Sequence, residues 1–189
     1  MLLIRNLIIF CALSVSCLAD EPLEIVKRFY GELKALDVRH DIEEKTIGKF
    51  RPLMTESLNQ EFTASQKAMA AWWKAENEER AALAKLKAGD GVVVQSDNKP
   101  PFVDSPIFSG IHEAGEVESY GDPSAGAGRA YIPVKVIDKL SQPSVSWVDV
   151  VILHQTKDGW RIDDILYFME EGHPRSSLRA GIDSKDLKH

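Results

Sequence analysis

The segment from residue 145 to 168, VSWVDVVILHQTKDGWRIDDILYF, constrains the fold of this chain more than any other stretch. Two runs rich in Val, Ile, Trp and Tyr, which favour strands, are joined by residues 156–159. The Asp-Gly pair in this linker is a strong turn signal, because glycine takes a positive φ at no steric cost. The segment predicts a long antiparallel β-hairpin. In its first run the residues that point to either face of the strand are mostly apolar, so we expect a central strand that is covered on both faces.

The second run of the hairpin contains the adjacent acids Asp163 and Asp164. Strict alternation from Ile162 places Asp164 on the inner face of the sheet. A β-bulge at the two acids instead shifts the phase, so that Ile165 and Tyr167 point inward. We favour the bulge, or a solvent position for Asp164. The alternative is a buried Asp164 with a raised pKa that serves as a general base.

A second acid, Asp149, shares one side of the first run with Trp147. If that side faces the interior, Asp149 and Asp164 form a carboxylate pair suited to proton transfer, and they are the candidate catalytic residues. We favour an outward position for Asp149, with ion pairs to Arg161 or Lys135. In that case the hairpin is a scaffold only.

Three helices are expected before the strands. Residues 21–38 have an apolar face at helical spacing, with Pro22 in the first turn, where proline is favoured. Gly31 within this helix lowers its intrinsic stability, which points to a close-packing role. Residues 46–54 predict a short helix that ends or kinks near Pro52.

The third helix is expected from residue 55 to about residue 87, with Thr55 as its cap. Trp72 and Trp73 cannot share a face, because neighbours lie about 100° apart around the axis, so one is expected in the core and one outside. Charged residues cluster at 76–80. We interpret them as a solvated face that contains a Glu76–Arg80 pair; a docking surface for a basic partner is the alternative.

Strands are expected at 115–120 and 129–137, ahead of the hairpin. Pro133 cannot donate to a ladder, which predicts an edge position or a bulge. Helices followed by a meander indicate an α+β fold, with three N-terminal helices packed on a curved antiparallel four-stranded sheet. We expect this domain to span residues 20–170, followed by a tail at 171–189 with a possible short helix.

Residues 1–19 have the order of a signal peptide: the cation Arg5, a short apolar run and small residues before Asp20. Two cleavage sites compete. Cleavage after Ala19 releases the domain into the periplasm or the medium. Cleavage before Cys17 gives an acylated outer-membrane lipoprotein. The apolar run is too short for a transmembrane anchor.

Composition excludes several classes of function. The two cysteines, Cys11 and Cys17, lie in the leader, so cleavage after Ala19 leaves no disulfide, zinc-thiolate site or cysteine nucleophile. Without Arg5, 22 basic residues face 29 acidic ones, a formal charge of −7, which argues against nucleic acid as a partner. The histidines have no metal-ligand spacing, and no motif indicates a cofactor.

The long loop at 92–110 carries an unusually apolar segment, PPFVDSPIF. Long loops in compact domains are often functional, and these side chains are expected to close the open end of the fold. We favour a structural plug over a pocket wall. If a ligand binds, the expected contacts are Phe102, Asp104, Phe108, Trp147 and Tyr131.

Several motifs resemble the nuclear-transport-factor-two-like superfamily, which includes ketosteroid isomerase and scytalone dehydratase. They are VKRFYGELKAL, FRPLMTESL and DGWRIDDILY. More narrowly, PPFVDSPIFSG, WRIDDILY and SSLRAGI resemble a domain-of-unknown-function family of bacterial envelope proteins. The resemblance covers about residues 21–182 and implies a cone-shaped α+β fold. It implies no particular chemistry, because this fold carries both enzymes and non-enzymes.

Our preferred hypothesis is a non-enzymatic, exported domain of the cell envelope that binds a small apolar ligand or a protein. The first alternative is a small acid–base isomerase or hydrolase that uses Asp149 or Asp164 inside the cone. The second is an immunity-type inhibitor of a secreted toxin. A filled cone argues against the enzyme, whereas a pocket with inward polar groups favours it.

Overall fold

The computed structural model describes residues 21–36, 44–87, 107–108, 115–170 and 173–183. Within them the fold is α+β: helices come first and are followed by a six-stranded antiparallel sheet that is not closed. The expected signal peptide, including Cys17, lies outside the described residues, as do Phe102 and Asp104.

The three expected helices are present. The Thr55 hydroxyl accepts a hydrogen bond from the Leu58 N–H at 3.2 Å, which confirms Thr55 as the cap of the long helix. Pro52 lies in a 3₁₀ turn directly after the second helix, as its missing N–H requires. The bounds are α1 Pro22–Leu36, α2 Glu44–Phe50, η1 Arg51–Leu53 and α3 Glu56–Lys87, and a short α4 covers Leu178–Ile182.

The sheet has six strands, where the sequence predicts four. The two additional strands are short and almost wholly exposed, so neither has the alternation that marks a half-buried strand. Neighbouring strands follow the order β1-β3-β4-β5-β6, with β2 also paired to β3. The bounds are β1 Glu116–Tyr120, β2 Ser124–Gly126, β3 Arg129–Asp138, β4 Val145–Thr156, β5 Gly159–Glu170 and β6 His173–Ser177.

The predicted hairpin is confirmed as β4 and β5, which pair from Thr156 and Gly159. Gly159 has a φ of 99°, which explains the glycine. The predicted bulge is also confirmed. Ile152 pairs with Asp164 and Leu153 with Ile162, so Asp163 is the extra residue.

Pro133 lies in an interior strand, β3, rather than at an edge. β1 pairs with β3 from Val134 onward and β2 pairs with it up to Tyr131, which leaves Pro133 between the two partners. Its carbonyl accepts a hydrogen bond from the Gly121 N–H at 2.8 Å, on the side away from β4. The missing N–H therefore falls where the ladder is interrupted, and it costs no bond to β4.

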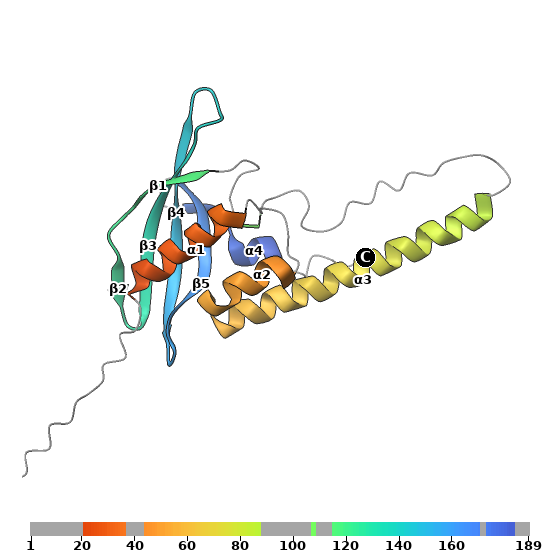
Figure 1. Cartoon of the computed structure of the whole chain (residues 1–189), viewed down its shortest axis with the longest axis horizontal. Helices are drawn as coiled ribbons and strands as arrows, with labels where there is room; N and C mark the ends of the chain where they lie inside the picture. The colour runs from red at the N-terminus through yellow and green to blue at the C-terminus, as the bar shows by residue number, and fades with distance from the viewer. Residues whose placement is uncertain (1–20, 37–43, 88–106, 109–114, 171–172, 184–189) are drawn as a thin grey trace, which may run out of the picture.

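The core lies between the helices and the inner face of the sheet (Figure 1). α1 crosses this face and contacts β3 and β5. Phe108 packs against Phe29, Phe50 and Phe62 at ring-centroid distances of 5.7, 4.9 and 5.8 Å. This aromatic cluster joins all three N-terminal helices to the segment before β1.

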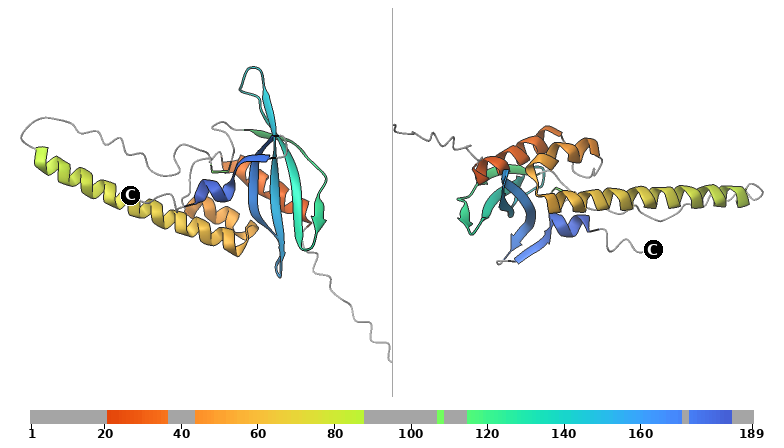
Figure 2. Two further views of the ribbon diagram at one scale, coloured as in Figure 1. Left: turned by 180° about the vertical axis from the view of Figure 1, so that it is seen from behind. Right: turned by 90° about the horizontal axis from the view of Figure 1, so that it is seen from below.

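α3 starts against the sheet and projects away from it over much of its length (Figure 2). Trp72 is buried and Trp73 is 44% exposed, so the two tryptophans divide as predicted. The Glu76–Arg80 pair is confirmed, with 2.7 Å between Glu76 Oε1 and Arg80 Nε. The solvated face expected at residues 76–80 is confirmed for residues 77–80, which are exposed. Glu76 is the exception and is 4% exposed, because it shares the covered helix face with Trp72. Among the described helices, none has the length and apolar character needed to cross a membrane.

Candidate functional site

A pocket of about 530 Å³ opens between α1 and the sheet. Helix α1 forms one wall, and β1, β3 and the start of β4 form the others. Its lining combines aromatic rings, lysines and acids: Lys27, Tyr30, Gly31, Leu33, Lys34, Phe108, Gly115, Glu116, Val117, Glu118, Ser119, Tyr120, Val136, Lys139, Leu140, Trp147 and Asp149.

Asp149 lies at the inner side of this pocket, and only 3% of it is exposed. The outward position that we favoured from the sequence is therefore wrong. Alternation along β4 buries Trp147, Asp149 and Val151 together, because all three lie on the inner face. The expected partners are engaged elsewhere: Lys135 pairs with Glu118 at 2.9 Å, and Arg161 donates to a backbone carbonyl.

Tyr30 reaches the same region from α1. Its hydroxyl is buried and has no hydrogen-bond partner of ordinary geometry among the described residues. Burial raises the pKa of Tyr30 well above its usual value, and the nearby carboxylate of Asp149 raises it further. Tyr30 therefore stays a neutral phenol at ordinary pH, and a hydrogen bond between its hydroxyl and Asp149 also contributes to the raised pKa.

Tyr167 is buried on the inner face of β5 and is close enough to Tyr30 and Asp149 to be affected by both. Burial raises its pKa well above the usual value, with smaller contributions from Tyr30 and Asp149. Its hydroxyl donates to the carbonyl of Ile107 at 2.8 Å. This bond fixes the segment that carries Phe108, so Tyr167 shapes the pocket wall.

The pocket walls are largely aromatic. The rings of Tyr30 and Tyr120 meet edge to face, with centroids 6.4 Å apart. Burial is the main cause of a raised pKa at Tyr120, and Lys27 opposes it. Trp147 packs so closely on Gly115 that a Cβ there would lie 2.7 Å from its Cη2 atom. Gly115 is thus required for the position of the indole.

Charged side chains surround the mouth. Lys139 Nζ lies 2.7 Å from Glu116 Oε2, and this hydrogen bond is the main cause of a lowered Glu116 pKa. Lys34 lowers it as well. Lys27, which also lines the pocket, pairs with Glu24 at 2.7 Å in an exposed ion pair on α1. Lys34 itself forms no ion pair within 4 Å with a described residue.

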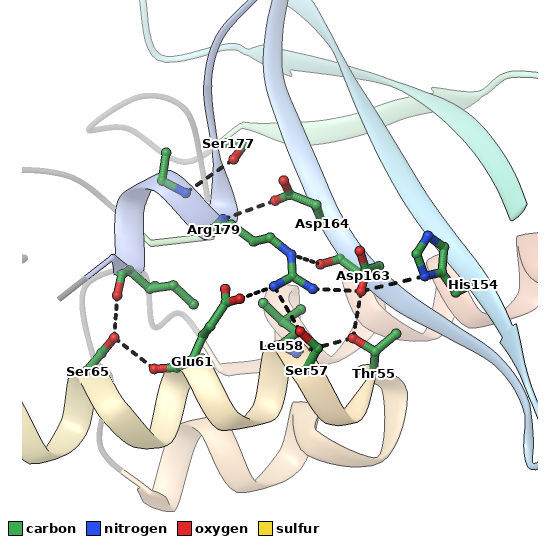
Figure 3. Close-up of polar contacts among 12 residues, drawn as sticks. Thr55, Ser57, Leu58, Glu61, Ser65, His154, Asp163, Asp164, Ser177 and Arg179 are labelled. Atoms are coloured by element: carbon green, nitrogen blue, oxygen red, sulfur yellow. Dashed lines mark hydrogen bonds and ion pairs between the residues drawn. The ribbon is translucent and has the colours of Figure 1, made fainter. Parts of the chain in front are cut away.

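The second candidate acid, Asp164, does not line the pocket. Its Oδ1 accepts a hydrogen bond from the backbone N–H of Ile165 at 2.8 Å. The same oxygen accepts one from the backbone N–H of Arg179 at 3.0 Å (Figure 3). Burial raises its pKa, and these hydrogen bonds oppose the shift. Asp164 therefore holds the start of α4 against β5.

Asp163, the bulged residue, belongs to the same polar cluster. Its Oδ1 accepts from the Thr55 hydroxyl at 2.9 Å and from Arg179 Nη2 at 2.6 Å (Figure 3). Arg179 also binds Glu61 on α3. His154 Nδ1 lies 3.8 Å from the same oxygen of Asp163. These contacts join the N-terminus of α3, the bulge and α4, which is a structural arrangement.

Of the predicted ligand-contact residues that the structure describes, two line the pocket and one does not. Phe108 and Trp147 line the pocket. Tyr131 is 40% exposed on β3 and does not line it, because alternation places it opposite the buried Ala130 and Ile132. His154, on β4, is partly exposed and is not among the pocket-lining residues.

Sequence reasoning missed Tyr30 and Tyr120. Tyr30 counts as one more apolar residue in the helical pattern of α1. The available signal was its hydroxyl, because a buried tyrosine usually directs this group toward a polar partner or a cavity. That signal does not identify the partner, since Asp149 is 119 residues away in the chain.

The described residues contain no group of three or more His, Cys, Asp or Glu side chains able to hold a metal ion. Comparison with family models, curated proteins and solved structures finds no match to this chain.

Proposed function

We propose that this chain is an exported small-ligand-binding domain of the cell envelope, with the cone-shaped fold of the nuclear-transport-factor-two-like superfamily. The order of helices and strands and the helices laid across one face of an open sheet support this fold. The signal-peptide pattern of residues 1–19 supports export.

One observation carries the binding function: the pocket places Asp149 and the Tyr30 hydroxyl among aromatic walls. Mostly apolar pockets with a few inward polar groups are typical of small-molecule sites. Asp149 accepts hydrogen bonds and Tyr30 donates one. A ligand with an apolar body and a polar group at its inner end, such as a hydroxyl or amide, can form a hydrogen bond with either side chain.

Gly31 offers a direct test, because a Cβ built on it meets no atom within 4 Å and the residue lines the pocket. The close-packing role expected for Gly31 is therefore wrong. Gly31→Leu fills the pocket while improving helix propensity. Gly126→Leu is the control, since Gly126 is equally open but lies in β2, outside the pocket.

The measurement is ligand-observed NMR of a fragment library against the mature chain. We expect wild type and Gly126→Leu to bind the same fragments and Gly31→Leu to lose them. Fragments that bind all three proteins equally would show that the pocket is not the binding site.

Acid–base catalysis at Asp149 is the second candidate, favoured by the position of this carboxylate in the pocket. A general base exchanges a C–H proton of its substrate with solvent. In D₂O, binding fragments that carry an acidic C–H should then lose that proton signal with wild type and keep it with Asp149→Asn. If wild type exchanges no such proton, the binding function stands without catalysis.

A further inference from the structure

The mouth of the pocket has an asymmetric arrangement of charge. Lys27, Gly31 and Lys34 are four and three residues apart, so they form a row along one face of α1, and all three line the pocket. Gly31 has open space at its Cβ position. The helix surface therefore has a gap at Gly31, with Lys27 on one side of it and Lys34 on the other.

The acids of the opposite rim do not neutralise this row. Glu116 binds Lys139 at 2.7 Å, and Glu118 binds Lys135 at 2.9 Å. Lys27 has Glu24 as its partner at 2.7 Å, in an exposed ion pair weak enough for an anionic ligand to replace Glu24. Lys34 has no ion pair with a described residue, although its field reaches Glu116 across the mouth. Among the described residues, the α1 side of the mouth therefore carries one unpaired cation, Lys34, and one weakly paired cation, Lys27.

The inner end of the pocket has the opposite character, because Asp149 repels an anion. An anionic group is consequently stable at the mouth only. The rings of Tyr30, Tyr120 and Trp147 also line the pocket and suit a planar or acyl body. The charges thus fix the direction in which an amphipathic ligand enters.

We propose that the pocket selects an amphipathic organic anion, with its negative group held between Lys27 and Lys34 and its apolar body directed toward Tyr30 and Asp149. The proposal rests on the proposed binding function and specifies its ligand class. Carboxylate, sulfonate and phosphate head groups share the required chemistry.

Two matched probes test the charge. 8-Anilinonaphthalene-1-sulfonate carries an anionic group, and N-phenyl-1-naphthylamine has the same rings without it. Titration calorimetry with the mature chain should show tighter binding of the sulfonate. Its affinity should fall as salt rises, while that of the uncharged probe stays nearly constant.

The double variant Lys27→Gln/Lys34→Gln should weaken sulfonate binding roughly tenfold and change binding of the uncharged probe less than about twofold. Lys45→Gln/Lys49→Gln is the control, since both lysines are exposed on α2 and are absent from the pocket lining. It makes the same change in net charge and should leave both affinities unaltered.

The outcomes separate this inference from the proposed function. If Gly31→Leu displaces both probes but the lysine variant weakens them equally or not at all, the pocket binds ligands and the anion preference is wrong. If Gly31→Leu displaces neither probe, or wild type binds neither, both proposals fail.

Discussion

The guanidinium Nη2 of Arg179 lies 2.6 Å from Oδ1 of Asp163, the extra residue of the bulge in β5. The Nε of Arg179 also donates to the carbonyl of Asp163 at 2.8 Å. One side chain thus holds both the backbone and the carboxylate of the bulge. The bulge allows the side chains of Ile165 and Tyr167 to point into the core, so this contact fixes the strand that carries Tyr167.

Arg179→Ala should lower the free energy of unfolding by about 1–3 kcal/mol, because it removes charged hydrogen bonds to Asp163 and Glu61. Urea denaturation measures the loss. Arg179→Lys keeps the charge without the planar fork and should fall between wild type and alanine. Equal stability of all three proteins would contradict the role given to this cluster.

Thr55→Val should destabilise the fold by about 1 kcal/mol or more. The hydroxyl caps α3 through the Leu58 N–H and donates to Asp163 at 2.9 Å, and valine does neither. Thr55→Ser retains the hydroxyl and is the matched control. Thermal unfolding should rank wild type and serine close together and valine clearly below them.

Asp164 has a pKa raised above its ordinary value of 3.8, with burial as the main cause. Ionisation is therefore easier in the unfolded chain, so stability from this group is present below pH 3.8 and is lost as pH rises through the folded pKa. Asp164→Asn keeps the Oδ1 acceptor and stays neutral. Its stability relative to wild type should increase from pH 3.5 to pH 7.

Urea midpoints at several pH values within this range check the Asp164 prediction. Asp158→Asn in the exposed hairpin turn is the control and should follow wild type at each pH. A variant whose relative stability decreases toward pH 7 would show that the charged form of Asp164 is the stabilising one.

Gly115→Ala should cost about 1–3 kcal/mol, because the added Cβ overlaps Val136 and comes within 2.7 Å of the Trp147 ring. The indole must then move, so binding in the pocket should weaken too. Gly126→Ala adds the same methyl group in open space and should change stability little. Chemical denaturation compares the two variants, and similar stabilities would remove the packing argument.

Local pattern was sufficient for much of the fold. Three features follow from residue propensities and helical periodicity over a few residues. They are the Asp-Gly turn, the Thr55 cap and the burial of Trp72 but not Trp73. The bulge was also predictable, because two adjacent acids interrupt an apolar strand. β2 and β6 were not predictable, since exposed strands gain their stability from pairing rather than from a hydrophobic face.

The sequence by itself determined the three N-terminal helices, the four longer or partly buried strands, their order and the α+β class. Only the tertiary structure decided which acid enters the pocket. Asp149 and Asp164 both lie in the hairpin, yet one lines the pocket and the other binds the start of α4. The physical reason is that alternation fixes which residues share a face, whereas the helices packed on the sheet decide which face is buried.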